Sequence, residues 1–313
     1  MDAPSTLRFV GLDIGGSFLK GACVNPAGKV ERRLHEKVEK DSLESLLQQL
    51  ERAVRSLAGP SGARAVGLGI PGIVEQGTAL VRVAPNVGVL NGYAFGADFA
   101  KRIGMPTFAE NDANAAALAE AWLGAGRGSE RQIFVSLGTG IGAGIILDGR
   151  IWSGASGYAG EIGHIQVEPD GLPCGCGSRG CLETVAGIPG WIRRAEVALA
   201  SQASALSGQA LEPKSIVEAA QAGDAVALEI VAESARALGI GIGATLNLLN
   251  LDRVVLGGGV AAAGDFLLRR VVDEVRKRTF PQVFADCAFK LAELSGDAGV
   301  VGAARVAIIG LSQ

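Results

Sequence analysis

One layout occurs twice along this 313-residue chain: a strand, a glycine loop, a second strand, a tight turn and a third strand. The first copy begins at Leu7 and has Gly15-Gly16 as its loop. The second begins at Ile133 and has Gly138-Thr139-Gly140 in the corresponding place. Because a repeated layout indicates repeated folding units, the chain is predicted to form two related α/β halves that face each other across a central cleft.

Helical and strand patterns fill the rest of the chain. In residues 41–57 the apolar side chains fall on one helical face, and Asp41 and Glu44 are the expected capping pair. The alanine-rich residues 111–123 predict a helix that packs closely. The other predicted elements are strands over 7–14, 19–24, 29–34, 65–70, 133–137, 141–147 and 253–256, a hairpin turn at Asp148-Gly149, and helices over about 187–208, 214–249 and 264–278.

The composition restricts the class of protein. Hydrophobic residues make up 48% of the chain and charged residues 19%, which argues against disorder. The 46 glycines lie in clusters without a triplet period, as expected for tight loops. A formal charge of −3 predicts no attraction for nucleic acid. We find no bilayer-length apolar stretch and no secretory signal before Asp13, so a soluble, cytoplasmic protein with no membrane partner is expected.

Three glycine loops follow predicted strands, and glycine lets backbone N–H groups approach a phosphate closely. Asp13 ends the first strand, where its carboxylate could hold Mg²⁺ on the transferring phosphates. A strand, not a helix, follows Gly15-Gly16, which excludes a dinucleotide fingerprint and a Walker motif. Gly138-Thr139-Gly140 would add donors from the other half, and Gly257-Gly258-Gly259 a floor for a base or ribose. Tight turns without a ligand are the alternative, but three such loops favour phosphoryl transfer.

A cluster of metal-binding residue types lies in the second half of the chain. Cys174, Cys176 and Cys181 fall within eight residues, and His164, one of only two histidines, precedes them by ten. One imidazole and three thiolates make the tetrahedral set that structural Zn²⁺ prefers. A redox cysteine pair and accidental clustering are the alternatives. A zinc-bound His164 would have its tautomer fixed and present its other nitrogen as a donor, although a structural staple without substrate contact is also open.

Asp112 lies where the alanine-rich helix is expected to begin, in the stretch Glu110-Asn111-Asp112-Ala113-Asn114. A carboxylate at a helix N-terminus stays ionised and could accept a proton from a hydroxyl group. The alternative is an ordinary N-cap, since Asn and Asp both suit that position. The local sequence alone does not decide between the two roles.

Together these motifs resemble the ROK family of sugar kinases and repressors, over nearly the whole chain. The matching stretches are Leu12-Asp13-Ile14-Gly15-Gly16, Gly69-Ile70-Pro71-Gly72, Glu110 to Asn114, Glu161-Ile162-Gly163-His164, Cys174 to Glu183, and Leu256 to Gly259. The resemblance implies a two-domain actin-like ATPase (ribonuclease H-like) fold with a zinc-binding loop. We expect a smaller N-terminal domain over 1–115, completed by a C-terminal helix at about 298–313, and a larger domain over 116–297 that carries the cysteines.

The resemblance also implies an activity and a set of site residues. It implies phosphorylation of a hexose by ATP with Mg²⁺, in a homodimer with structural zinc and with Asp112 as the base. The implied sugar-binding residues are Gly72, Asn86, Asn111, Asp112, Glu161, His164 and Glu183. The implied nucleotide-binding residues are Asp13, Gly15, Gly16, Ser17, Lys20, Gly138, Thr139, Gly140, Gly258 and Gly259. Ser17 departs from the family, which often has threonine there, but either hydroxyl can serve.

Glucose is the expected substrate, because it is the commonest for stand-alone members with this pattern. An N-acylmannosamine kinase shares the same motif residues, and some relatives use polyphosphate as the donor. A sugar-responsive repressor would carry a helix-turn-helix module before the first glycine loop, and only twelve residues precede Asp13. The sequence therefore predicts a glucokinase-like hexokinase, with these activities as alternatives.

Overall fold

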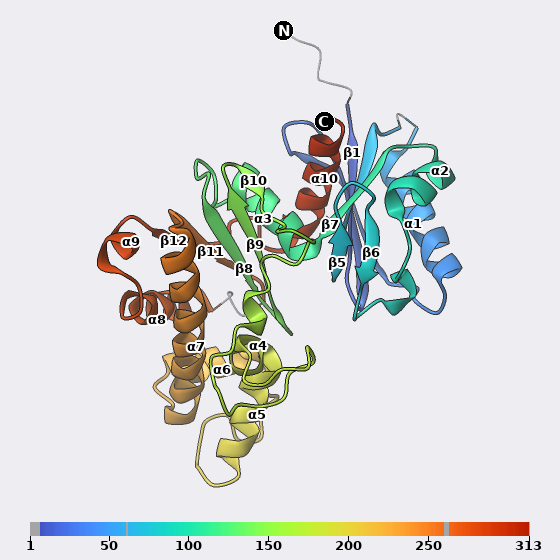
Figure 1. The fold of residues 1–313 in the computed structure, drawn as a ribbon. Coiled ribbons are helices and arrows are strands. Elements are labelled where there is room, and N and C mark those ends of the chain that lie inside the picture. The colour runs from blue at the N-terminus through green and yellow to red at the C-terminus, as the bar shows by residue number, and fades with distance from the viewer. Residues whose placement is uncertain (1–6, 61, 260–262, 313) are drawn as a thin grey trace. The chain divides into compact units, whose positions relative to one another are not determined.

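The computed structural model describes residues 7–60, 62–259 and 263–312, which form two compact units (Figure 1). Unit 1 contains the chain up to Arg127, the excursion Ile151–Ala159, and the segment from Leu294 onwards. Unit 2 contains Gly128–Arg150 and Gly160–Glu293. The domain boundary predicted between residues 115 and 116 falls within helix α3 and stays a prediction.

Unit 1 is built on a five-stranded sheet in the order β3-β2-β1-β4-β7. The central strand β1 pairs antiparallel with β2 and parallel with β4, which in turn pairs parallel with β7. A separate hairpin is formed by β5 and β6. The strands are β1 (Phe9–Ile14), β2 (Phe18–Val24), β3 (Val30–Lys37), β4 (Ala65–Ile70), β5 (Ile73–Glu75), β6 (Leu80–Val83) and β7 (Thr107–Asn111).

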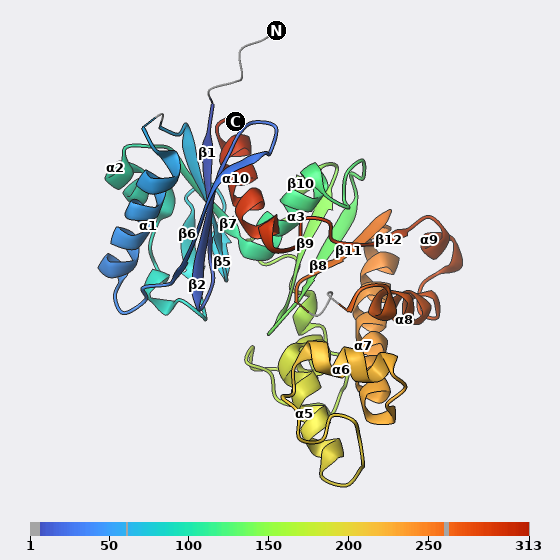
Figure 2. The ribbon, with the colours of Figure 1, turned by 180° about the vertical axis from the view of Figure 1, so that it is seen from behind.

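Helices cover both faces of this sheet. Figures 1 and 2 show α1 on one face and α3 with α10 on the other. Apolar residues of α1 close one core, while α3 and α10 pack on each other through alanine and glycine. The helices of unit 1 are α1 (Leu43–Ala58), α2 (Ala100–Ile103), α3 (Asp112–Leu123) and α10 (Ala298–Gly310).

Helix α10 lies backbone to backbone on the sheet and on α3. A Cβ on Gly67 of β4 would lie 1.8 Å from the carbonyl oxygen of Ala303, and one on Gly302 would lie 1.8 Å from that of Ala115. Buried Glu120 of α3 accepts the backbone N–H of Leu294, which holds the segment leading to α10. Absence of side chains is therefore what lets α10 complete this face.

Gly67→Ala is expected to destabilise the protein by at least about 2 kcal/mol, because the added methyl overpacks a rigid backbone contact. Chemical denaturation followed by circular dichroism would measure this loss. Gly88→Ala is the matched control, since a Cβ on exposed Gly88 meets no atom within 4 Å. Equal unfolding midpoints for the two variants would contradict the close approach of α10.

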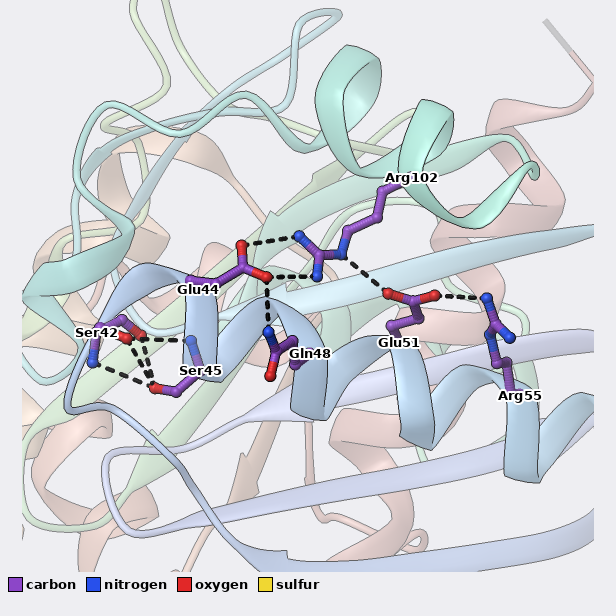
Figure 3. Close-up of polar contacts among 7 residues, drawn as sticks. All are labelled: Ser42, Glu44, Ser45, Gln48, Glu51, Arg55 and Arg102. Carbon is purple, nitrogen blue, oxygen red and sulfur yellow. Dashed lines mark hydrogen bonds and ion pairs between the residues drawn. The ribbon is translucent and has the colours of Figure 1, made fainter.

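The start of α1 differs from the sequence-based prediction. Ser42 is the N-cap and forms a reciprocal capping box with Ser45, so the predicted pair of Asp41 and Glu44 is wrong (Figure 3). Glu44 instead binds Arg102, whose guanidinium donates 2.9 and 2.7 Å hydrogen bonds to the two carboxylate oxygens. These hydrogen bonds lower the pKa of Glu44 to about 2. The hydroxyl of Ser42 accepts the backbone N–H of Ser45, whereas the carboxylate of Glu44 binds Arg102 of α2.

Unit 2 is built on a second five-stranded sheet in the order β10-β9-β8-β11-β12. Its long helix α7 packs against α4, α5, α6 and α8, and one hydrophobic core joins these helices to the sheet. The strands are β8 (Gln132–Leu137), β9 (Ile141–Leu147), β10 (Arg150–Ile151), β11 (Arg253–Gly257) and β12 (Ala288–Leu291). The helices are α4 (Leu182–Ala186), α5 (Ile188–Leu199), α6 (Pro213–Gln221), α7 (Ala225–Leu249), α8 (Asp265–Arg276) and α9 (Pro281–Ala285).

The two sheets share one topology, which confirms the predicted repeat. Each starts with a strand that pairs antiparallel with the next strand and parallel with a later one: β1 with β2 and β4, and β8 with β9 and β11. Asp148 and Gly149 both have positive φ, as a tight hairpin turn requires. The predicted helix over 187–208 ends at Leu199, and that over 214–249 is broken between α6 and α7. None of the described helices combines the length and apolarity needed to span a membrane.

Candidate functional site

The carboxyl ends of the parallel strands in unit 1 bring two predicted carboxylates together. Asp13 of β1, Gly69 of β4 and Glu110 of β7 are aligned by strand register, and Asp112 begins α3 directly after β7. A Cβ on Gly69 would lie 3.8 Å from an Asp13 carboxylate oxygen and 3.7 Å from the Asp112 Cα. Ligands of open α/β sheets bind at such strand ends.

Asn111 is the N-cap of α3, and Asp112, the first residue of the helix, also accepts the backbone N–H of Ala113 at 2.9 Å. The Asn111 side-chain oxygen accepts the backbone N–H groups of Ala113 and Asn114, at 2.9 and 3.1 Å. Its side-chain nitrogen donates to the carbonyl of Gly72 at 2.9 Å. The same side-chain nitrogen carries a second N–H, which could donate to a ligand. Asp112 occupies the first turn of α3, where the helix dipole favours a carboxylate.

The first glycine loop lies in the same part of unit 1. The N–H of Gly15 donates to the carbonyl of Phe18, which closes a tight turn between β1 and β2. A Cβ on Gly16 would lie 3.1 Å from the Cβ of Asn86, so this glycine and the predicted sugar residue are neighbours. Ser17 is exposed at the tip of the turn. Lys20 stands opposite Asp13 in the β1–β2 register.

Asp13 sits against Gly299 of α10, whose Cβ would come within 2.4 Å of its carboxylate. Burial raises the pKa of Asp13, and the charge of Lys20 opposes that shift. The folded protein therefore holds a proton on Asp13 more tightly than the unfolded chain does. An ionised Asp13 costs folding free energy, as expected of a group kept for binding a cation.

Asp13→Asn is expected to raise Tm at about pH 8, because it removes the charge of a half-buried carboxylate and keeps the size of the side chain. Since the pKa of this carboxyl is raised in the folded state, the wild type loses stability as pH rises through that pKa. The Tm difference should shrink as pH falls towards the ordinary aspartate value of 3.8. Differential scanning calorimetry against Asp148→Asn, in an exposed turn, measures it. A lower Tm for Asp13→Asn at about pH 8 would contradict this account.

The structure adds Glu110, which the sequence analysis quoted in a motif without giving it a role. Its buried carboxylate accepts hydrogen bonds from the backbone N–H of Asn111 and from the side chains of Asn114 and Gln76. Burial raises its pKa, while these three donors act in the opposite direction. In the sequence, the indication that Glu110 belongs to the site is that it directly precedes Asn111.

The four predicted metal ligands come together in unit 2. One ligand atom from each of His164, Cys174, Cys176 and Cys181 lies within 4.8 Å of the others. The sulfur atoms of Cys176 and Cys181 are 3.7 Å apart. Four ligands at Zn–S distances of about 2.3 Å give a tetrahedron with edges of about 3.8 Å, so the donor set fits zinc. These four residues would hold the ion and leave it no open position.

The predicted sugar residues of unit 2 surround this cluster. The Nδ1 atom of His164 lies 3.5 Å from the sulfur of Cys174 and 3.6 Å from a carboxylate oxygen of Glu183. Its Nε2 atom lies 3.7 Å from a carboxylate oxygen of Glu161. A Cβ on Gly140 would lie 2.9 Å from the Glu183 carboxylate, so the second glycine loop is adjacent.

The second and third glycine loops lie at the ends of paired strands β8 and β11. Gly258 has a φ of 86°, and a Cβ there would lie 2.4 Å from the carbonyl oxygen of Leu137. The carbonyl of Gly138 accepts the N–H of Ile188, which places the start of α5 beside this loop. Beside Gly259, unit 2 has a hollow of about 360 Å³, whose lining residues are Pro213, Lys214, Val217, Glu218, Gln221, Gly259 and Ala263.

The predicted site residues thus form two groups, each gathered within its own unit. Unit 1 holds Asp13, Gly15, Gly16, Ser17, Lys20, Gly72, Asn86, Asn111 and Asp112. Unit 2 holds Gly138, Thr139, Gly140, Glu161, His164, Cys174, Cys176, Cys181, Glu183, Gly258 and Gly259. Lys214, Glu218 and Gln221 line the hollow beside Gly259, and the sequence analysis gave them no role because they carry no motif and follow an ordinary helical pattern.

Known proteins similar to this chain include both enzymes and regulators. A glucokinase from Halalkalibacterium halodurans is 36% identical, over 94% of this chain and 93% of its own length. A xylose repressor from Caldicellulosiruptor bescii is 30% identical, over 96% of this chain and 77% of its own length.

A solved structure is similar over nearly the whole chain. It is the crystal structure of a ROK family glucokinase from Streptomyces griseus in complex with glucose and AMPPNP, which is 34% identical to this chain. The match has a TM-score of 0.83 and covers 97% of this chain and 100% of that one. The family description "ROK family" matches residues 9–309. This chain therefore belongs to the ROK family and has its actin-like ATPase fold.

Proposed function

We propose that the protein is an ATP-dependent hexokinase that phosphorylates the 6-hydroxyl of glucose. The observation that carries this is the placement of Asp112 in the first turn of α3, beside Asp13, with Asn111 serving as the N-cap. Phosphoryl transfer to a hydroxyl needs one carboxylate to accept the proton and a second to hold the metal ion, and here both would lie at the same strand ends. The similarity to glucokinases supports the same interpretation.

In this proposal Asp112 accepts the proton of the sugar hydroxyl as that oxygen bonds to the γ-phosphorus. The bond from the γ-phosphorus to the bridging oxygen breaks, and ADP leaves. The dipole of α3 keeps Asp112 ionised and ready to take the proton. The sugar hydroxyls are held by Gly72, Asn86, Asn111, Glu161, His164 and Glu183.

The nucleotide is held by the three glycine loops. Asp13 carries the charge needed to hold Mg²⁺, which neutralises the phosphoryl oxygens when it is bound with ATP. The backbone N–H of Gly16, with Ser17 and Lys20, faces the phosphates, while Gly15 closes the turn by donating its own N–H to Phe18. Thr139 and Gly140 add donors, and Gly138 closes that loop by donating its N–H to the carbonyl of Gly140. The hollow lined by Gly259, which follows Gly258, takes the nucleoside.

Structural zinc has a positional role in this scheme. When Nδ1 of His164 faces the sulfur atoms, its Nε2 is left to carry a proton and to donate. Its neighbour on that side is Glu161, at 3.7 Å, so the loop orients both groups towards a sugar. Location in the cytoplasm and assembly as a homodimer belong to the same proposal, and the homodimer rests on the resemblance to the family.

An N-acylmannosamine kinase is the second candidate, since every residue of the proposed mechanism would serve it equally. A coupled ADP-release assay with MgATP separates the two, using glucose, mannose, fructose, N-acetylmannosamine and N-acetylglucosamine. Glucose should give the highest kcat/KM. Preference for N-acetylmannosamine would change the substrate and leave the mechanism. Turnover only with polyphosphate would change the donor, and no turnover at all would refute the proposed function in favour of a sugar-responsive regulator.

A further inference from the structure

The carboxylate of Glu110 is the centre of a small hydrogen-bond network in unit 1. One oxygen, Oε1, accepts the backbone N–H of Asn111 at 2.9 Å and the side-chain amide of Asn114 at 3.0 Å. The other, Oε2, accepts the side-chain amide of Gln76 at 3.2 Å. The same nitrogen of Gln76 also donates to the hydroxyl of Ser153 at 2.5 Å. Three chain segments, at residues 110–114, 76 and 153, therefore meet around one buried acid.

Burying this carboxylate lowers the stability of the folded protein, and the fold does not need a carboxylate at this place. Glu110 is 9% exposed, and burial raises its pKa. An apolar residue at the same place in β7 would avoid that cost. Three donors from three different residues converge on the carboxylate instead. Such convergence suits a group that fixes the position of its neighbours.

The network joins two segments that matter to the proposed reaction. Its first end is Asn111, the N-cap of α3, directly before Asp112. Its second end is Ser153 in the excursion 151–159, which continues along the chain into Gly160 and Glu161. The excursion is also held at Gly157, whose φ is 86° and whose Cβ would lie 3.2 Å from the carbonyl oxygen of Val74. Gln76 follows β5 and bridges the two ends.

We propose that Glu110 is a positioning residue, which acts through Gln76 and Ser153 to hold the excursion 151–159 and the first turn of α3 in register. This inference rests on the proposed function for its kinetic consequence, because Asp112 is the group it positions. It assigns Glu110 no contact with substrate. The structural part of the proposal does not depend on the substrate: the Glu110–Gln76 pair connects the excursion 151–159 to the first turn of α3.

Substitutions at Gln76 and Glu110 distinguish this network from ordinary packing. Gln76→Glu places a second carboxylate oxygen 3.2 Å from Glu110 and removes both donated hydrogen bonds. Glu110→Gln is milder, since Gln76 can turn its amide over and accept from the new amide at position 110 and from the Ser153 hydroxyl.

The double variant exchanges the roles of the two side chains. The new carboxylate at position 76 accepts from the new amide at position 110 and from the hydroxyl of Ser153. The amide oxygen at position 110 still accepts from Asn111 and Asn114, so every hydrogen bond of the network has a donor and an acceptor. The second substitution should therefore rescue the first.

The experiment measures kcat, the KM values for sugar and ATP, and amide hydrogen exchange in full-length protein. Gln76→Glu should lower kcat at least about 10-fold, in line with strong coupling between contacting groups, with KM for ATP nearly unchanged. Exchange should become faster in residues 151–159 and in the first turn of α3. The double variant should return to within about threefold of Glu110→Gln in kcat and recover its exchange pattern.

A matched control is the exposed pair of Gln48 and Glu44 on α1, where the same kind of amide-to-carboxylate hydrogen bond measures 2.9 Å (Figure 3). Gln48→Glu should change neither kcat nor exchange in 151–159. If Gln76→Glu fails to fold, Ser153→Ala replaces it, with faster exchange expected in 151–159 alone. A Gln76→Glu variant that behaves like wild type, or a double variant no better than Gln76→Glu, would overturn the network. If the wild type phosphorylates no sugar, the proposed function fails and the exchange data alone decide whether the network exists.

Discussion

Asp112→Asn is expected to lower kcat by about 10³-fold, the middle of the range for losing a general base. The amide cannot take the proton of the attacking hydroxyl, but it keeps the size and most hydrogen bonds of the carboxylate. Asn111 caps α3 through two backbone N–H groups, and the new amide oxygen can still accept the Ala113 N–H that Asp112 shares, so the helix should not fray. Sugar affinity, measured by isothermal titration calorimetry, should change by less than about threefold.

The control for this variant is Asp98→Asn, an exposed aspartate in the same unit, which should keep wild-type turnover. A circular dichroism spectrum and melting curve would show that both variants fold alike. Turnover by Asp112→Asn within about tenfold of wild type would remove Asp112 from the role of base. Another carboxylate at these strand ends would then have to take the proton.

Cys176→Ala is expected to empty the zinc cluster and to raise the KM for sugar by about 10- to 100-fold, the usual range for losing an interaction that orients a metal site. Cys176 is the exposed cysteine of the cluster, so alanine there removes one ligand without opening a core cavity. His164 then loses the ion that fixes its ring beside Glu161 and Glu183. Zinc content by elemental analysis and steady-state kinetics measure both effects.

Cys287→Ala is the matched control, because Cys287 lies in the same unit and outside the metal cluster. Its zinc content and sugar KM should equal those of the wild type. Unchanged zinc in Cys176→Ala would show that the other three ligands suffice, or that the cluster serves another purpose. Lost zinc with an unchanged sugar KM would make the loop a structural staple without a role in binding.

Much of the fold was predictable because glycine marks where strands end. Six of the seven predicted strands, including 65–70 and 141–147, match the structure within two residues at each end. The start of α1 could not be chosen from the sequence, since Asp41 and Ser42 are both good N-cap residues. Only the structure shows that Ser42 pairs with Ser45, while Glu44 binds Arg102. The short strands β5, β6 and β12 were not predicted either, because three or four residues show too little alternation of apolar and polar side chains.

Local spacing explains which site residues could be found from the sequence. Cys174, Cys176 and Cys181 are close along the chain, so their chemistry is recognisable before any fold is known. Glu110, Gln76 and Ser153 are different, because 34 residues separate the first two and 77 separate the last two. Only the pairing of β4 with β7 and the return of the excursion to unit 1 bring them together. A single sequence contains no pattern that predicts these contacts.

The placement of α10 has a consequence for how the protein is made. Unit 1 needs residues 298–310 to cover one face of its sheet, yet these leave the ribosome after all of unit 2. The glycine-lined face of the sheet formed by β1, β4 and β7 therefore stays uncovered while Gly160–Glu293 is translated. Unit 2 is interrupted only by the excursion, so it can fold while the first unit is still incomplete. Nascent chains should thus resist proteolysis in unit 2 first, and Asp13, which lies against Gly299 of α10, reaches its final surroundings last.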